Sequence, residues 1–419
     1  MTHNPPTGLR RLLVLIGPGL IVAATGVGAG DLATGALTGS KLGLVVLWAV
    51  ALGSFLKFVL TEGLTRYQLA SGQTALEASI HKWGHPLRIL YLTYLILWTF
   101  FTCSALMGAS GVVAHAMFPL YDAEKDKIIY GILHSFIALV LVQRGGFQVF
   151  EKFMSLCVGV MFVSTVGTAI ALQPDWSEFL RGLIWPTFLG LDAEGRQWTI
   201  GVIGGVGGTV TLLCYGYWIR EVGRKGTESI GVCRADLATG YIMTALFGLA
   251  MVVIGSRITV DGTGSRLVVK LGEQLQQAFG DAGIYVKWAF LAGAWSAVFS
   301  SVLGVWQSAP YLFVDALETR RSTSASPEEI RKNRRYGYFL WMLATVPAIS
   351  LWVKFESVQK WYAIFGAAFL PLLALVLLML NLRSPELEPR YRNRWWTNLL
   401  LLAAIAFFAF SGWLEVAGG

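Results

Sequence analysis

The chain has 419 residues, of which 55% are hydrophobic and only 14% are charged, and its mean hydropathy is +0.59. Soluble domains carry about 25% charged residues, so this composition excludes an ordinary soluble protein and indicates a polytopic membrane protein. The formal net charge of +8 does not indicate nucleic-acid binding, because basic residues in membrane proteins set the orientation in the bilayer. We expect the lipid bilayer as a partner, and neither a nucleic-acid partner nor a cofactor.

A helix needs about 20 mostly apolar residues to cross a bilayer. By this rule the sequence predicts an all-α membrane protein with about eleven transmembrane helices. The predicted segments are Leu12–Thr38, Leu42–Arg66, Leu87–Phe118, Lys127–Val142, Phe150–Leu172, Thr199–Ile219, Ala235–Gly255, Ile284–Val314, Tyr336–Val353, Val358–Leu382 and Trp396–Leu414.

The distribution of lysine and arginine between the loops predicts the orientation. With the N-terminus in the cytoplasm, every large basic cluster lies inside, including Arg10–Arg11, Arg331–Arg335 and Arg390–Arg394. We therefore expect a multi-pass protein of the plasma (inner) membrane with a cytoplasmic N-terminus. Because the number of predicted spans is odd, the C-terminus is expected outside.

The first apolar segment is interrupted at Thr25–Asp31, where three glycines precede a carboxylate. Each glycine weakens a helix by about 1 kcal/mol relative to alanine. Irregular backbone is tolerated at membrane depth only where protein or a water-filled cavity satisfies it, and an acidic residue there is a candidate functional residue. The stretch predicts a broken helix that contributes to a substrate site. The alternative is that the glycines only allow close helix packing and that Asp31 only caps the second half-helix.

A second glycine-rich stretch, Gly201–Thr209, opens the sixth predicted helix. Glycine is common in membrane helices, but interruptions at matching places in two halves are typical of transporters with inverted repeats. The two interruptions lie in the first and sixth predicted helices, five helices apart, so the halves face opposite ways. We predict a single transporter domain with a first repeat over 12–172, a second over 199–382 and an extra C-terminal helix over 396–414.

The broken helices suggest the chemistry of the site. Half-helix ends expose unpaired backbone groups and a partial charge. We expect free carbonyls before Gly28 and near Gly208 to coordinate a cation, and the amides of Ala29, Gly30 and Asp31 to be available to an anionic group. Because the Asp31 carboxylate would repel an anion, the site favours a cation or a proton.

Few other polar residues lie at depth. Lys57 and Glu62 are either a gating pair, or a snorkelling lysine with a glutamate near the cytoplasmic end. Asp236 is expected at the interface, and His134 as a hydrogen-bonded packing residue. The aromatic stretch that starts at Tyr215 either lines a pocket for an organic cation or is ordinary membrane-helix composition.

The sequence does not indicate an enzyme. Ser296 and Ser300 lack the histidine and aspartate partners that nucleophilic catalysis requires. A sensor or scaffold without transport is the remaining alternative, and it would bind a ligand without showing flux.

Several short stretches resemble the Nramp (natural resistance-associated macrophage protein) family of divalent metal transporters. In the first helix they are GPGLIVA at Gly17–Ala23 and GDLAT at Gly30–Thr34. Further stretches are Leu47–Trp48, Ala70–Gly72, Gly207–Val210, Leu291–Gly293 and Leu370–Pro371. The resemblance implies a leucine-transporter-type 5+5 inverted repeat with helices 1 and 6 broken, and proton-coupled uptake of manganese, iron and related ions.

The family's metal-binding motifs are not kept in this chain. The family's run Asp-Pro-Gly-Asn is replaced by Gly28-Ala29-Gly30-Asp31, so a carboxylate survives three residues later. The family's Met-Pro-His becomes Thr211–Leu213, which removes the soft thioether that suits transition metals. The acidic pair associated with proton movement aligns with Cys103 and Leu106, and a further histidine aligns with Trp218.

From these residues we expect a secondary transporter that moves a cation by alternating access. A hard-oxygen site suits Mg²⁺ with some of its waters better than Mn²⁺ or Fe²⁺. The alternative is a small organic solute, an amine or an amino acid, because the many small residues leave room for it. The expected substrate-binding residues are Gly28, Ala29, Gly30, Asp31, Gly208, Thr209, Thr211 and Tyr215, with Asp31 as the candidate metal ligand.

Overall fold

The computed structural model describes residues 9–257, 266–318, 326–382, 385 and 387–417, and its regular secondary structure in these ranges is helical throughout. The α-helices are α1 (Leu9–Gly26), α2 (Ala29–Leu42), α3 (Leu47–Ser71), α4 (Ala75–Met117), α5 (Ala123–Ala171), α6 (Trp176–Ile184), α7 (Ala193–Gly205), α8 (Tyr215–Glu221), α9 (Ile230–Ser256), α10 (Leu267–Ala278), α11 (Gly283–Glu318), α12 (Pro327–Lys332), α13 (Arg334–Thr345), α14 (Phe355–Asn381) and α15 (Trp395–Ala417). Two of the short 3₁₀ segments matter below, η2 (Val210–Cys214) and η5 (Val346–Trp352).

Each predicted apolar segment is helical in the structure. Several of them, however, are not single straight helices. The fourth and fifth segments are the two parts of α5, which turns at Gly146, where φ is +63°. A similar glycine, Gly84 with φ +74°, kinks α4 just before Pro86. The ninth segment is α13 continued by η5. These turns occur at glycine because a positive φ costs other residues energy.

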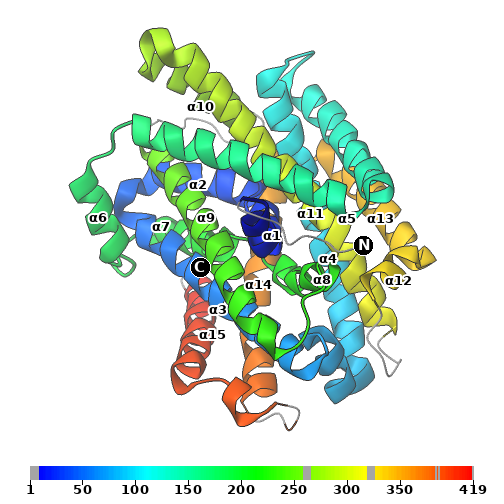
Figure 1. Cartoon of the computed structure of the whole chain (residues 1–419). Coiled ribbons are helices and arrows are strands. Elements are labelled where there is room, and N and C mark those ends of the chain that lie inside the picture. The colour runs from blue at the N-terminus through cyan, green and yellow to red at the C-terminus, as the bar shows by residue number, and fades with distance from the viewer. Residues whose placement is uncertain (1–8, 258–265, 319–325, 383–384, 386, 418–419) are drawn as a thin grey trace.

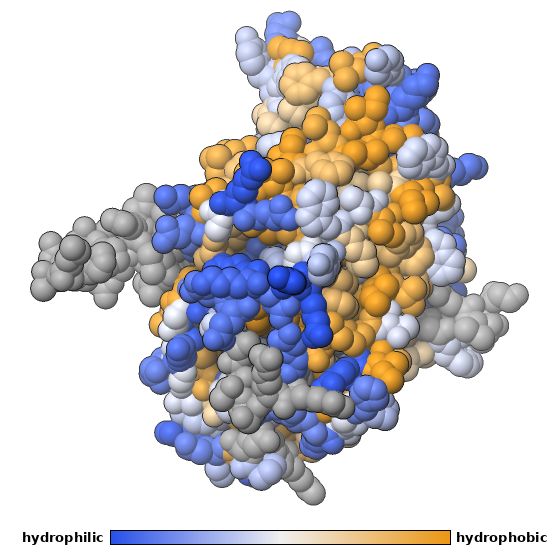
Figure 2. All heavy atoms as spheres, turned by 90° about the vertical axis from the view of Figure 1, so that its right-hand side faces the viewer, coloured by the Kyte–Doolittle hydropathy of each residue, from blue (hydrophilic) through white to orange (hydrophobic). Residues whose placement is uncertain are grey.

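Seven helical segments in the described ranges are long and apolar enough to cross a membrane by length and composition. The number is smaller than eleven because α2 and α3 count as one segment, both parts of α5 count as one, and α13 and α15 do not qualify. Many large apolar side chains are exposed, such as Leu156, Val163 and Ile184, as expected for a lipid-facing surface. Figure 2 shows apolar side chains over a broad area of one face, with hydrophilic side chains gathered toward its lower part.

Helix α1 lies near the centre of the molecule, whereas α15 lies at its edge (Figure 1). Small residues bring the central helices into backbone contact. A Cβ atom at Gly255 of α9 would lie 2.1 Å from the Ala36 carbonyl oxygen of α2, and one at Gly39 would lie 2.2 Å from the Val252 carbonyl oxygen. Such close packing through glycine is typical of membrane helices, and it fixes α2 against α9.

Candidate functional site

Two helix breaks define the centre of the candidate site. Helix α1 ends at Gly26 and α2 begins at Ala29, while α7 ends at Gly205 and η2 begins at Val210. In the second break Gly207 and Gly208 have φ values of +81° and +80°, which only glycine adopts without strain. The prediction that the first and sixth helices are broken is confirmed.

The two breaks contact each other directly. A Cβ atom at Gly26 would lie 2.7 Å from the carbonyl carbon of Gly207, and one at Gly208 would lie 3.3 Å from the Cα atom of Gly26. A side chain at Gly26 would therefore push the two broken helices apart. The glycines that interrupt the helices are thus also the residues that allow the breaks to meet.

Asp31 lies at this junction and is only 1% exposed. Its carboxylate accepts a hydrogen bond from the Gly207 backbone amide, at 3.3 Å to Oδ1 and 3.4 Å to Oδ2. The N-cap residue of α2 is Gly28, so Asp31 lies in the first turn rather than at the cap position. A carboxylate there is favoured by the helix dipole, and it also links α2 to the second break.

Lys57 of α3 occupies the other side of the second break. Its side chain is 0% exposed, and its ammonium donates hydrogen bonds to the carbonyl oxygens of Val206 and, at 2.9 Å, Gly204. These carbonyls end α7 and lack the partners that a continuous helix would supply, and a cation is favoured at that end. Lys57 also interacts electrostatically with Asp31.

Both predicted roles of Lys57 are wrong. It does not snorkel, because its ammonium is buried against α7. It does not pair with Glu62, whose carboxylate instead meets Arg66 at 3.1 Å and Arg234 at 2.7 Å. The five-residue spacing puts Lys57 and Glu62 on different faces of α3, so each meets a different neighbour.

The carbonyl groups before Gly28 are not free, contrary to expectation. The Ser300 hydroxyl of α11 lies 3.0 Å from the Ala24 carbonyl oxygen, and the Ser301 hydroxyl lies 3.1 Å from the same oxygen and 3.0 Å from that of Val27. A cation at either break therefore competes with a side chain that already contacts the carbonyls.

The glycines of the first break face neighbouring helices. A Cβ atom at Gly28 would lie 2.7 Å from the Ser301 hydroxyl oxygen, and one at Gly30 would lie 3.1 Å from a ring carbon of Tyr362. Ala29 begins α2 between them. The position of the family's metal-binding aspartate, Gly28, is thus filled from α11 by the side chain of Ser301.

The threonines of the second break line its α7–η2 connection. Thr209 accepts a hydrogen bond from the Trp98 indole at 3.0 Å. A Cβ atom at Gly208 would lie 2.4 Å from the Thr211 hydroxyl oxygen, so that side chain packs on the break itself. Gly208, Thr209 and Thr211 are therefore brought together with Asp31 around the junction.

Tyr215 belongs to a different cluster. Its hydroxyl donates to Asp236 at 2.8 Å, and Asp236 also meets Arg224 at 2.6 Å and accepts from the Gly19 amide at 2.7 Å. Asp236 is 0% exposed and lies near the start of α9, and its expected position at the membrane interface stays a prediction. His134 is a packing residue as predicted, with one ring nitrogen bonded to the Tyr130 carbonyl and the other to the Trp295 indole.

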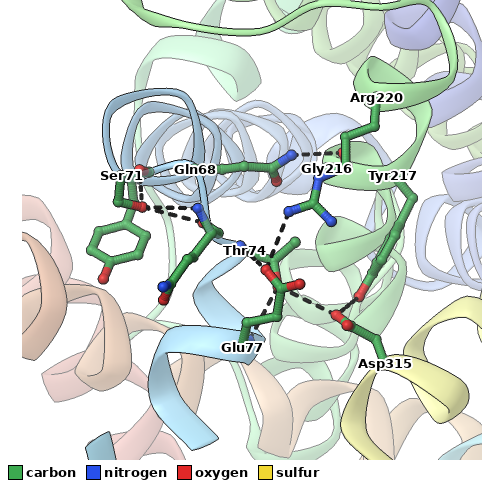
Figure 3. A network of polar contacts seen from close by, with 10 residues as sticks. Gln68, Ser71, Thr74, Glu77, Gly216, Tyr217, Arg220 and Asp315 are labelled. Carbon is green, nitrogen blue, oxygen red and sulfur yellow. Dashed lines mark hydrogen bonds and ion pairs between the residues drawn. The ribbon is translucent and has the colours of Figure 1, made fainter. Parts of the chain in front are cut away.

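A polar network ties α8 to its neighbours (Figure 3). Arg220 of α8 meets Glu77 of α4 at 3.2 Å, and the Tyr217 hydroxyl donates to Asp315 of α11 at 2.5 Å. Gln68 of α3 donates to the carbonyl oxygen of Gly216 at 2.8 Å. The second half of the sixth helix is therefore fastened to three other helices at the end of the molecule that carries the α3–α4 connection.

The described residues contain no group of three or more histidine, cysteine, aspartate or glutamate side chains placed to hold a metal ion. The residues that align with the family's proton-route acids and histidine, Cys103, Leu106 and Trp218, are all buried and at most 2% exposed. Asp31 is the carboxylate that the two breaks share, and the other polar groups at the breaks are backbone and hydroxyl groups and the Lys57 ammonium.

The facing breaks and the long apolar helices define a multi-pass membrane protein of the leucine-transporter type. The chain matches the family described as natural resistance-associated macrophage protein-like over residues 19–416, and it therefore belongs to this family. The predicted membership and fold class are confirmed.

Among its relatives is the divalent metal cation transporter MntH of Bradyrhizobium diazoefficiens, which is 24% identical over 64% of this chain and 60% of that protein. MntH of Bacillus subtilis is 25% identical over 44% of this chain and 43% of its own length. These matches thus span less than two thirds of each relative.

Solved structures show the same fold. A mutant of the Eremococcus coleocola manganese transporter superposes with a TM-score of 0.78 at 15% identity, covering 100% of this chain and 89% of that one. MhsT in complex with L-phenylalanine superposes with a TM-score of 0.58 at 17% identity, covering 94% and 96%.

Proposed function

We propose that this protein is a secondary transporter that moves a cation across the membrane by alternating access. The observation that carries the proposal is the contact between two broken helices at a buried carboxylate, Asp31. Broken helices at the midplane are where transporters of this architecture bind their substrates. Family membership and the relatives named as divalent metal cation transporters support a cation as the substrate.

The site favours a cation that keeps part of its hydration. Its candidate ligands are the carboxylate of Asp31 and the hydroxyls of Thr209 and Thr211, which are hard oxygens. Soft sulfur ligands favour transition metals, and the family's methionine is replaced by Thr211 in this chain. Mg²⁺ usually keeps several waters and needs few protein ligands, so we propose a Mg²⁺-like ion rather than Mn²⁺ or Fe²⁺.

Flux into proteoliposomes tests this proposal, with Mg²⁺ and Mn²⁺ compared side by side and a pH-sensitive dye inside. We expect Mg²⁺ flux that Asp31→Ala abolishes. The matched control is Asp175→Asn, at the exposed N-cap of α6, which should transport normally. Full transport by a folded Asp31→Ala protein contradicts the proposed site, and Mn²⁺ uptake with acidification would show that the replaced ligands matter little.

A small organic solute is the second candidate. The buried Lys57 ammonium offsets the Asp31 carboxylate, so the junction has no net negative charge to attract a divalent ion. A small organic solute without net charge, such as a zwitterionic amino acid, suits such a site better. A thermal-shift screen of amines and amino acids on the purified protein tests this candidate, and it gains support only if one of them stabilises the protein while Mg²⁺ and Mn²⁺ do not.

The orientation is part of the proposal: N-terminus in the cytoplasm, C-terminus outside, and repeats over 12–172 and 199–382. The cysteines of the described residues are buried, so an introduced surface cysteine can be labelled selectively. In intact cells we expect an impermeant maleimide to label Ser177→Cys, before α7, and not Lys225→Cys, before α9. The reverse pattern would invert the proposed topology.

A further inference from the structure

Helix α6 lies at the edge of the molecule (Figure 1) and, with nine residues, is too short to cross a bilayer. One side of it packs inward. A Cβ atom at Gly182 would lie 2.0 Å from the Leu44 carbonyl oxygen, which belongs to the connection between α2 and α3. The backbone of α6 therefore rests directly on this connection.

Another side of α6 carries large apolar side chains that stay exposed. Trp176, Leu180 and Ile184 are four residues apart, so they follow one another along the same side of the helix. Trp185 comes directly after the helix, and all four side chains are 53–71% exposed. Amphipathic helices of this kind, with tryptophan at their ends, are typical of the interface between lipid tails and headgroups.

The connection that follows α6 gives its depth in the bilayer. Phe188 packs on Phe407 of α15, with the ring centroids 5.9 Å apart. Exposed tryptophans mark both ends of α15, Trp395 at one end and Trp413 at the other. The rise of an α-helix places these two about 27 Å apart, close to the thickness of the hydrocarbon core. By the same rise Phe407 lies about 9 Å from Trp413, inside the core, so the chain dips below the interface after α6.

One arginine borders the exposed apolar side chains. Arg181 lines a groove of about 360 Å³ together with Leu180, Ile184 and Trp185. Within the described ranges no acidic side chain forms an ion pair with Arg181. The acidic residue one turn earlier, Glu178, does not line the groove. The groove thus combines apolar walls with an unpaired positive charge at the depth of the headgroups.

This combination matches a phospholipid. Acyl chains are buried against apolar side chains, and a guanidinium binds phosphate oxygens through paired hydrogen bonds. The net charge favours one kind of headgroup. Phosphatidylcholine carries an ammonium that offsets its phosphate, whereas phosphatidylglycerol keeps its negative charge, and basic residues at a membrane surface attract anionic lipids.

We propose that α6 binds an anionic phospholipid, with the phosphate on Arg181 and the acyl chains on Leu180, Ile184 and Trp185. The proposed orientation places this lipid in the outer leaflet. The site goes beyond the proposed function, and its occupation does not depend on which solute the protein carries. Because α6 rests on the connection between α2 and α3, a bound lipid should stabilise the folded protein.

The test is the melting temperature of the purified full-length protein in detergent, titrated at equal ionic strength with phosphatidylglycerol, phosphatidylcholine or inorganic phosphate. A ligand that binds only the folded state raises the melting temperature as its concentration exceeds its dissociation constant. We expect a saturating rise with phosphatidylglycerol, a smaller one with phosphatidylcholine and none with inorganic phosphate. No transported substrate is present, so failure here is distinguishable from failure of the flux experiment.

Variants assign the effect to this helix. Arg181→Gln should weaken the apparent affinity for phosphatidylglycerol about five-fold or more, since one basic residue at an anionic surface contributes that much. Its response to phosphatidylcholine should change less. Trp185→Ser should weaken the response to both lipids, because it removes apolar contact. The matched control is Lys125→Gln, two predicted spans before α6 on the same side, whose exposed ammonium is already paired with Asp122 at 2.9 Å.

The substituted side chains are exposed, so the variants should fold, and gel filtration checks this. An unchanged response to phosphatidylglycerol in folded Arg181→Gln would overturn the proposal, and so would an equal loss in Lys125→Gln. Equal rises with the two lipids would overturn the anionic headgroup, and an equal rise with inorganic phosphate would overturn the lipid. A changed oligomeric state of Trp185→Ser, with its lipid responses kept, would assign the groove to a second copy instead.

Discussion

Lys57 changes how the centre of this protein is interpreted. A lysine at membrane depth is costly unless it is paired, and here its ammonium meets two carbonyls and interacts with Asp31. It supplies, as part of the chain, a positive charge at the open end of α7. A substrate cation that approaches Asp31 must therefore also approach the Lys57 side chain, which is a permanent part of the second break.

Removing only one of the Lys57 and Asp31 charges should destabilise the folded protein more than removing both. Loss of one partner of a buried pair typically costs about 3–5 kcal/mol, because the other charge remains buried without compensation. We expect Lys57→Met to lower the melting temperature strongly, and Lys57→Met with Asp31→Asn to recover part of that loss. Thermal unfolding in detergent of the wild type, Lys57→Met, Asp31→Asn and the double variant gives the coupling energy.

The control for this cycle is Glu62→Gln on the same helix as Lys57. The Glu62 side chain is 14% exposed and meets Arg66 and the exposed Arg234, so its loss should have a smaller effect. A double variant that is no more stable than Lys57→Met would show that Asp31 and Lys57 are not coupled.

Whether the role of a residue could be predicted depends on how far away along the sequence its partners lie. Asp31 was found because it follows glycines in one short stretch. The role of Lys57 was not, since its acceptor Gly204 lies 147 residues away. Ser300 is considered in the sequence only for catalysis and Ser301 not at all, because nothing local shows that these serines face the end of α1. The Thr74–Glu77 pair carries a local signal for a helix start, the capping-box pattern, and α4 indeed begins there, before the predicted Leu87.

At the level of the elements, glycine determines both the breaks and the packing. The breaks were predictable because glycines cluster at Gly26–Gly30 and Gly204–Gly208. The turn within α5 at Gly146 separates two predicted segments, so its place was predictable from the gap between them. The backbone contact between α2 and α9 was not predictable, because single glycines such as Gly39 and Gly255 resemble any other glycine in a membrane helix.

Two glycines of α9 provide a matched test of that packing. Gly255→Ala would place a methyl group 2.1 Å from the Ala36 carbonyl oxygen, whereas nothing lies within 4 Å of a methyl group at Gly231. Overpacking costs about 1–3 kcal/mol, so Gly255→Ala should lower the melting temperature. Gly231→Ala should leave it equal or slightly higher, since alanine favours a helix. Equal effects of the two substitutions would contradict the close α2–α9 contact.

At the scale of the whole molecule, polar contacts hold α8 against three neighbouring helices at the end that carries the α3–α4 connection. Its three ties run to α3, α4 and α11, through Gln68, Glu77 and Asp315 (Figure 3). Alternating access requires that one half of a broken helix move relative to its neighbours, so these ties must break in any state that opens this end. Substitutions in these contacts should shift the equilibrium between the closed and open states of this end without changing Asp31.

Glu77→Gln is suited to this purpose. Glutamine can still serve in the capping box with Thr74, so α4 keeps its N-terminus, but the ion pair with Arg220 is lost. A hydrogen bond between charged groups is worth about 1.5–3 kcal/mol, and the balance should shift about ten-fold or more toward the open state. Cys214 in η2 is 0% exposed in the present state and reports the opening.

In a background where Cys103, Cys157 and Cys233 are replaced by alanine, we expect maleimide to label Cys214 roughly ten-fold faster in Glu77→Gln than in the parent. Glu62→Gln serves as the control, because Glu62 pairs with Arg66 and Arg234 and takes no part in the ties of α8. Faster labelling in Glu77→Gln alone, with flux preserved, would mean that the Arg220–Glu77 pair holds this end closed. Equal labelling in the parent and both variants would mean that α8 is held by packing, and that the opening movement occurs elsewhere.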